Sequence, residues 1–106
     1  MNNINRGEVN LVFTTQILTL RPSFQALYEI EFSCSKSILN MLLNFPQDQL
    51  KINEIIEIIR FGAKAYDGET LSTQKIEQLL NEKPIIEILP TLLKFLKNAI
   101  GIKEII

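Results

Sequence analysis

The sequence predicts an α+β fold dominated by helices, with an N-terminal β-hairpin followed by a bundle of about four to five short helices. Up to residue 21, apolar and polar residues alternate in two short runs, which is typical of half-buried strands. From residue 24 onwards, apolar residues recur at spacings of three and four, which indicates helices. The chain has 106 residues, of which 46% are hydrophobic, and it contains no internal repeat or obvious linker. We therefore expect one domain over 1–106, with a core that needs no disulfide or metal.

The hairpin is expected over about 8–21. Its first run, "GEVNLVF", alternates Val9, Leu11 and Phe13 with their neighbours, and its second run is "QILTLR". β-Branched and apolar residues of this kind favour strands. The connector "TTQ" lacks the Asn-Gly or Asp-Gly pair that marks a tight two-residue turn. The pattern therefore predicts the two strands without defining the turn.

The first helix is expected over about 24–33. Ser23 is expected to be its N-cap, because the hydroxyl can accept a hydrogen bond from a free N–H of the first turn. Five residues at helical spacing define the side of this helix that we interpret as apolar: Phe24, Leu27, Tyr28, Glu31 and Phe32. Glu31 is the one charged member of that side. We expect it to anchor a nearby backbone group or an arginine.

The next two helices are expected over about 36–44 and 53–66. Ser35 is expected to cap the first of them, which ends at Asn44-Phe45-Pro46 because the residue before a proline disfavours the α region. Asn53 is expected to cap the second. This second helix carries a broad isoleucine-rich stripe, and a charged face of glutamates and lysine looks outward.

Gly62 lies inside the 53–66 helix, where glycine costs up to ~1 kcal/mol relative to alanine. We therefore expect a strand or helix to approach it closely. Asp67-Gly68 then marks the end of the helix and a turn. A fourth helix is expected over about 73–82, with Ser72 as N-cap and Leu71 packed across it onto Ile76.

The last helix is expected over about 85–100, with Pro84 in its first turn, where the missing N–H costs nothing. Pro90 predicts either a kink or a short turn followed by a separate helix that begins at Pro90 or Thr91. The polar positions trace one narrow stripe: Glu87, Thr91, Lys94 and Asn98. The apolar positions therefore cover well over half of the helix circumference, more than a one-faced surface helix needs.

Several classes of function are excluded or disfavoured by composition. The chain has no histidine and one cysteine, Cys34, which removes the commonest general base and rules out a structural zinc site. Its glycines form no phosphate-binding loop, and its glutamate pairs define no acid–base pair. We expect Cys34 to be an inert thiol and the protein to be no enzyme, with no cofactor and no metal. The net charge of -1 gives no pull toward nucleic acid or anionic lipid.

The order and spacing of four stretches resemble a known family. The stretches are "RGEVNLVF", "LTLRPSFQALYEIE", "INEIIEIIRFGAKAYDGE" and "LSTQKIEQLL". Together, over about 6–100, they resemble the small tail-assembly proteins of alphaproteobacterial gene transfer agents and prophages. These are grouped with phage tail-assembly chaperones and have also been labelled tail tube proteins. The chain departs from the family pattern at "TTQ", where a glycine turn is usual, and in its long isoleucine-rich last helix.

The resemblance implies a non-enzymatic role in tail morphogenesis in the cytoplasm of a bacterial host. The expected role is a chaperone that binds the tape-measure protein and is absent from the finished particle, with the tail tube protein as a second expected partner. The alternatives are a structural, tube-associated component and a small protein-binding regulator. The N-terminus lacks the order of a secretory signal, and charged residues interrupt the apolar C-terminal segment, so no membrane span is expected.

The wide apolar surface of the last helix has three explanations. It is the central helix of its own domain, or an interface of a homo-oligomer, or a groove for the tape-measure chain. The residues expected to face the core are Leu89, Leu92, Leu96 and Ala99. The residues expected to point elsewhere and bind a partner are Ile88, Leu93, Phe95 and Ile102.

Overall fold

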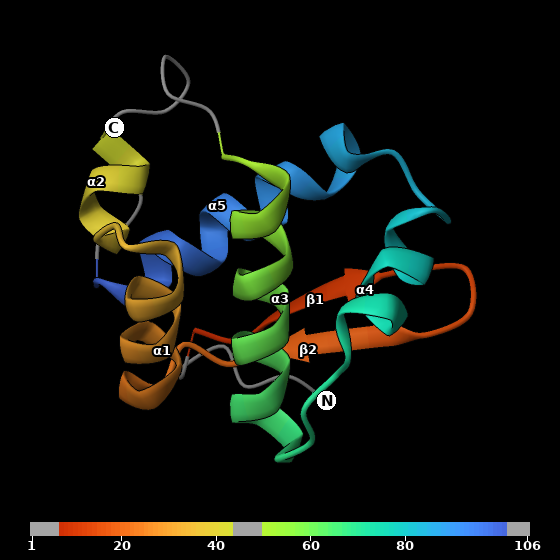
Figure 1. Ribbon diagram of the computed structural model, residues 1–106, viewed down its shortest axis with the longest axis horizontal. Helices are drawn as coiled ribbons and strands as arrows, with labels where there is room; N and C mark the ends of the chain where they lie inside the picture. Colours follow the sequence, from red (N-terminus) through yellow and green to blue (C-terminus); the bar gives the residue numbers. More distant parts are fainter. Residues whose placement is uncertain (1–6, 44–49, 102–106) are drawn as a thin grey trace.

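In a computed structural model, the chain forms one two-stranded sheet and five helices within the parts that the structure describes, residues 7–43 and 50–101. The elements follow the predicted order (Figure 1). They are β1 (Val9–Val12), β2 (Ile17–Leu20), α1 (Phe24–Cys34), α2 (Ile38–Leu43), α3 (Ile52–Asp67), α4 (Thr73–Leu80) and α5 (Ile85–Ala99). The prediction of an N-terminal hairpin followed by helices is confirmed.

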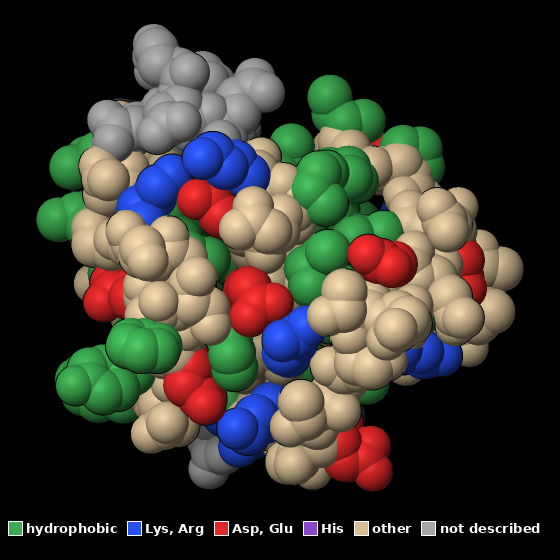
Figure 2. All heavy atoms as spheres, viewed as in Figure 1, with side chains coloured by type: hydrophobic (Ala, Val, Ile, Leu, Met, Phe, Trp, Pro, Cys, Tyr) green, Lys and Arg blue, Asp and Glu red, His purple; other side chains and the backbone are tan. Residues whose placement is uncertain are grey.

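Helix α3 occupies the middle of the arrangement. It lies beside α1, packs on β2 and also contacts α4 and α5, while α5 reaches across to β1 and α2 (Figure 1). One cluster of buried apolar side chains draws members from all seven elements. On the face shown in Figure 2, acidic and basic side chains are interspersed without a patch of one sign, in keeping with the small net charge.

The hairpin pairs β1 and β2 antiparallel, with Val9 opposite Leu20 and Val12 opposite Ile17. Alternate residues of β1 are buried, as the sequence pattern predicts. The turn consists of Thr14 and Thr15, closed by a 2.9 Å hydrogen bond from the Phe13 N–H to the Gln16 carbonyl. A two-residue turn without glycine or asparagine lacks the favoured residue types.

A clamp from the α4–α5 connection holds this turn. The Glu82 carboxylate accepts hydrogen bonds from the Thr15 N–H at 3.1 Å and from the Thr15 hydroxyl at 2.7 Å. The Lys83 ammonium donates to the Val12 carbonyl at 2.8 Å. These hydrogen bonds from Thr15 lower the pKa of Glu82. The turn is therefore defined by residues about 70 positions away, not by its own sequence.

Helix α1 begins as predicted and α2 does not. The Ser23 hydroxyl accepts a hydrogen bond from the Ala26 N–H at 3.1 Å. Ser35 is instead the C-cap of α1, with a left-handed φ of 52°, so its assignment as the cap of the next helix was wrong. Ser37 has that role, because its hydroxyl accepts from the Asn40 N–H at 2.9 Å.

The Glu31 side chain joins the ends of these two helices. Its Oε2 accepts a 2.8 Å hydrogen bond from the Ile38 N–H, at the start of α2. The expectation that Glu31 anchors a nearby backbone group is confirmed. The predicted end of α2 at Asn44-Phe45-Pro46 lies outside the described residues.

Helix α3 begins at Ile52, so the prediction that Asn53 caps it was wrong. The Glu54 carboxylate satisfies the start of the helix instead, by accepting from the Lys51 N–H at 2.9 Å. The same side chain is 3% exposed and pairs with the Lys36 ammonium at 3.0 Å. At the other end, Gly68 closes the helix with a φ of 83°, which confirms the predicted stop.

Gly62 lies where α3 meets β2. A Cβ at this position would stand 3.0 Å from the Leu20 Cβ and 3.2 Å from the Phe95 Cζ. The Gly62 carbonyl also accepts a 3.0 Å hydrogen bond from the Arg21 N–H. The predicted close approach is confirmed, and it brings β2 and α5 together on one turn of α3.

Helix α4 is capped as predicted, because the Ser72 hydroxyl accepts from the Lys75 N–H at 3.1 Å. Helix α5 runs continuously from Ile85 to Ala99 with Pro90 inside it. The alternative of a separate helix beginning at Pro90 or Thr91 was therefore wrong. Pro90 is exposed, and the carbonyl that loses its intrahelical partner belongs to Ile86, whose side chain is 75% exposed. On that side water can hydrate the carbonyl, which reduces the cost of the proline.

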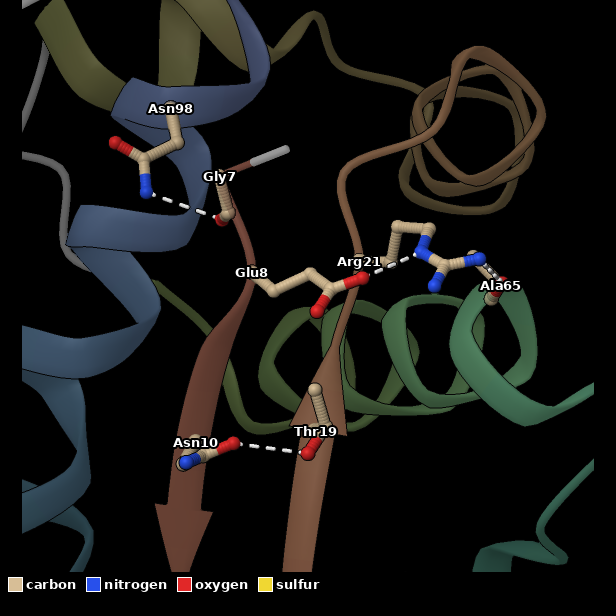
Figure 3. A network of polar contacts seen from close by, with 7 residues as sticks. All are labelled: Gly7, Glu8, Asn10, Thr19, Arg21, Ala65 and Asn98. Atoms are coloured by element: carbon tan, nitrogen blue, oxygen red, sulfur yellow. Dashed lines mark hydrogen bonds and ion pairs between the residues drawn. The ribbon is translucent and has the colours of Figure 1, made fainter. Parts of the chain in front are cut away.

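A polar network fixes the base of the hairpin (Figure 3). The Glu8 side chain is 1% exposed and pairs with the Arg21 Nε at 2.7 Å. The Arg21 guanidinium also lies 5.3 Å from the centre of the Tyr66 ring. The Asn98 amide donates to the Gly7 carbonyl at 3.1 Å (Figure 3). Through these contacts the first strand is tied to α3 and to the last helix.

Candidate interaction surface

Three aromatic side chains of α1 project into solvent at spacings of four residues. Phe24 is 91% exposed, Tyr28 is 76% exposed and Phe32 is 87% exposed. Residues four apart lie on one helix face, so the three rings form a continuous aromatic stripe. Apolar groups this large and this exposed mark an interaction site when they gather in one patch.

The inner face of α1 explains why these rings are outside. Ala26 and Ile30 are buried against the core, and Leu27 and Cys34 are partly buried beside them. The spacing in the sequence places Leu27 with the aromatic residues on one apolar side, whereas the structure divides that side in two. Small and aliphatic residues therefore occupy the inner face of α1, and the three aromatic rings lie on its exposed face.

Helix α2 extends the apolar surface. Leu39 is 48% exposed and Leu43 is 71% exposed, again four residues apart. In Figure 2 hydrophobic side chains jut out along the left edge of the molecule, where Figure 1 draws α1 and α2. We refer to Leu39 and Leu43 as the α2 leucines. The aromatic stripe and the α2 leucines therefore form an exposed apolar surface that extends over two helices at one edge of the molecule.

An open hollow of about 620 Å³ adjoins the aromatic stripe. We call it the α1–α3 pocket, and it is lined by Tyr28, Glu29, Glu31, Phe32, Ser33 and Phe61. Glu29 pairs with the Lys64 ammonium at 3.3 Å, and both side chains remain partly exposed. A second hollow of about 110 Å³ continues along α1 and shares Glu29 and Phe61 with the first. Together the hollows follow the line between α1 and α3.

The residues predicted to bind a partner lie elsewhere. Ile88 is 2% exposed and Phe95 is fully buried, so the expectation that they point away from the core was wrong. Leu93 is half-buried, and Ile102 lies outside the described residues. Of the predicted core-facing residues, Leu92 and Leu96 are buried and Leu89 and Ala99 are half-buried.

The packing of α5 explains the error. This helix contacts β1, α2 and α3, so parts of its own chain surround it on several sides. That arrangement matches the first of the three explanations, a central helix, and accounts for a polar stripe as narrow as the one in the sequence. As folded, Ile88 and Phe95 offer no surface to a partner.

The thiol and the carboxylates of the described residues can be examined for reactivity and for metal binding. Burial, followed by the nearby carboxylates of Glu54 and Glu57, raises the pKa of Cys34 to about 11, which leaves the thiol protonated and unreactive. Among residues 7–43 and 50–101, no cluster of histidine, cysteine, aspartate and glutamate could hold a metal ion. In the same ranges, no helix is long and apolar enough to span a bilayer.

A family model described as "Phage tail tube protein, GTA-gp10" matches residues 6–101. The chain belongs to this family. The resemblance to tail proteins of gene transfer agents and phages is therefore confirmed at the level of the family. No curated protein and no solved structure matches the chain. Membership of the GTA-gp10 family does not by itself identify a binding site on this chain.

Proposed function

We propose that this member of the GTA-gp10 family acts in the bacterial cytoplasm as a tail-assembly chaperone that covers a helical face of the tape-measure protein. The aromatic stripe on α1 is the observation that carries the proposal. A tape-measure protein offers long apolar helical faces, and an apolar helix docks on a surface that provides anchors one helical turn apart. Phe24, Tyr28 and Phe32 provide such anchors.

The size of the surface fits a reversible holder. Aromatic side chains bury ~150–250 Å² each, so three rings that are 76–91% exposed supply roughly 400–650 Å². A stable protein–protein interface buries about 800 Å² per partner. Stripe and α2 leucines together come close to that figure. Each copy would thus bind weakly alone, and many copies along one long chain would bind through avidity and still be displaced later.

A structural role in the tail is the second candidate, and a separate observation favours it. Val12 and Ile17 face each other across the hairpin and are 51% and 59% exposed. A subunit of a ring or a stack needs two different complementary surfaces, because its contacts run head to tail. The aromatic stripe and this hairpin pair would meet that need, and the family description names the tail tube.

Co-expression with the tape-measure protein from the same gene cluster separates the two candidates. The test variant is Phe24→Ser/Tyr28→Ser/Phe32→Ser, and the matched control is Val12→Ser/Ile17→Ser. All five side chains are at least half exposed, so both variants should keep the fold. The chaperone proposal expects the wild type and the hairpin variant to keep the tape-measure protein soluble and the stripe variant to lose it. Equal solubility with the stripe variant contradicts the proposal.

The composition of purified particles gives a second readout. Mass spectrometry should find the protein absent from finished tails if it is a chaperone, and present in many copies if it is a structural component. Substitutions at Phe95 are not suitable for either experiment, because Phe95 is fully buried and its replacement would test folding.

A further inference from the structure

The α1–α3 pocket has a distinctive lining for a hollow beside an apolar stripe. Three of its six lining residues are aromatic, Tyr28, Phe32 and Phe61, and two are carboxylates, Glu29 and Glu31. Among the described residues that line it, none is a lysine or arginine. We propose that this pocket receives a lysine or arginine side chain of the partner helix that docks on the aromatic stripe. The inference rests on the proposed function and specifies which sequence the partner helix must carry.

The chemistry of the lining supports a cation. An ammonium or guanidinium group is attracted to the face of an aromatic ring, more strongly when it is partly desolvated. A carboxylate adds a charge-assisted hydrogen bond. Glu29 and Glu31 use Oε2 for Lys64 and for the Ile38 N–H respectively, and in neither does Oε1 bond to the described residues. One carboxylate oxygen of each is therefore available to a ligand inside the hollow.

A second copy of this chain is the less suitable occupant. The sequence of α1, "FQALYEIEFSC", contains two glutamates and no basic residue. Pairing of two α1 helices about Tyr28 would bury the stripes against each other but bring no cation to either pocket. A helix with an apolar face that includes one lysine or arginine satisfies both the stripe and the pocket.

Two synthetic helical peptides test the inference on the full-length protein. Both have an alanine background with leucines on one face, and they differ at one central position of that face, which is arginine or its neutral isostere citrulline. Isothermal titration calorimetry at low salt should show the arginine peptide binding roughly tenfold more tightly to the wild type. Salt should reduce this preference because it screens exposed charges.

Three variants locate the effect. Glu31→Gln keeps a carbonyl oxygen that can accept from the Ile38 N–H, so the start of α2 is preserved. Glu29→Gln/Lys64→Met removes the Glu29–Lys64 pair without leaving a free ammonium beside the pocket. Each should bind both peptides about equally. Glu77→Gln, at an exposed position of α4 outside the pocket lining, is the matched control and should keep the preference.

Equal binding of the two peptides by the wild type overturns the inference, as does a preference that persists in both pocket variants. Failure of both peptides to bind also overturns it. The co-expression experiment remains a separate test of the proposed function, because it depends on the aromatic stripe and not on the pocket carboxylates. If the stripe variant fails to keep the tape-measure protein soluble and the wild type binds both peptides equally, the proposed chaperone function stands and the proposed cation site in the α1–α3 pocket does not.

Discussion

Replacing Gly62 with alanine should destabilise the protein, although the same exchange in an ordinary helix stabilises it. Alanine has a higher helix propensity, worth up to ~1 kcal/mol. The added Cβ, however, would lie 3.0 Å from the Leu20 Cβ, about 0.4 Å closer than the 3.4 Å at which ordinary contact begins. On another side it would meet the Phe95 ring at 3.2 Å.

Neither neighbour of Gly62 can easily yield. Leu20 is fully buried in a paired strand, and the Arg21 N–H that follows it is bonded to the Gly62 carbonyl itself. Phe95 is also fully buried. Overpacking of this kind costs ~1–3 kcal/mol, so the net loss of unfolding free energy should be roughly 1–2 kcal/mol. That corresponds to a Tm lower by about 5–10 °C for a domain of this size.

Thermal unfolding followed by circular dichroism measures this effect. Lys94 is exposed in the middle of α5, so the difference between Lys94→Ala and Lys94→Gly gives the propensity term alone in the same protein. Gly62→Ala should lower the Tm while the Lys94 pair shows alanine as the more stable residue. An increase in Tm for Gly62→Ala would refute the argument that β2 and α5 leave no space at this position.

Three further predictions concern charged and titratable groups. Glu82→Ala should lower the urea midpoint of unfolding at neutral pH. Hydrogen bonds from Thr15 lower the pKa of Glu82, so their contribution to stability is present above the unfolded-state pKa and is lost as pH falls through the folded-state pKa. The urea midpoints of wild type and variant should therefore converge in acid, and a difference that does not change with pH would contradict the clamp. The pKa of Cys34 is raised from 9.0 to about 11, so at neutral pH it should have about a hundredfold less thiolate than an ordinary cysteine. Iodoacetamide should therefore alkylate Cys34 about a hundredfold more slowly than free cysteine, and alkylation at the rate of free cysteine would contradict the desolvation of the thiol. Glu8→Gln should lower the free energy of unfolding, measured in urea, by ~1–3 kcal/mol, because it leaves the Arg21 charge without its carboxylate. Glu29→Gln removes the carboxylate of a more exposed pair and should lower the same free energy by under ~0.5 kcal/mol. Equal losses for the two variants would contradict the burial of the Glu8–Arg21 pair.

The parts of the fold that were predictable depend on neighbours in sequence. Alternation placed the strands, and Ser23 and Ser72 marked helix starts, because a cap involves a side chain and a backbone group three residues apart. Gly62 was informative because glycine inside a helix is costly and implies a close neighbour. The Asn53 and Ser35 assignments failed where several polar residues stand near a helix start, and only the fold decides which of them reaches the free N–H.

The aromatic stripe on α1 could not be predicted as an interaction surface, because apolar periodicity does not show whether an apolar face points to the core or to solvent. Phe24, Tyr28 and Phe32 repeat every four residues, and Ala26 and Ile30 define a second apolar line on the same helix. Two apolar lines on a short helix signal that one of them lies outside. For the last helix the prediction was wrong in the opposite sense. Its excess of apolar residues indicated that Ile88 and Phe95 lie on an exposed surface, whereas both are buried. Which helix lies in the middle depends on contacts between distant segments, and periodicity does not report those contacts.

The ties between the two ends of the chain have a consequence during synthesis. The Asn98 side chain holds the Gly7 carbonyl across 91 positions of sequence, and α5 packs on β1. A ribosome delivers β1 well before α5. Val9 and Leu11 therefore lack the cover of α5 until the chain has been synthesised as far as that helix. A nascent chain of this protein should depend on host holding factors until α5 has emerged, and a truncation that removes Phe95 and beyond should leave an insoluble fragment instead of a smaller folded one.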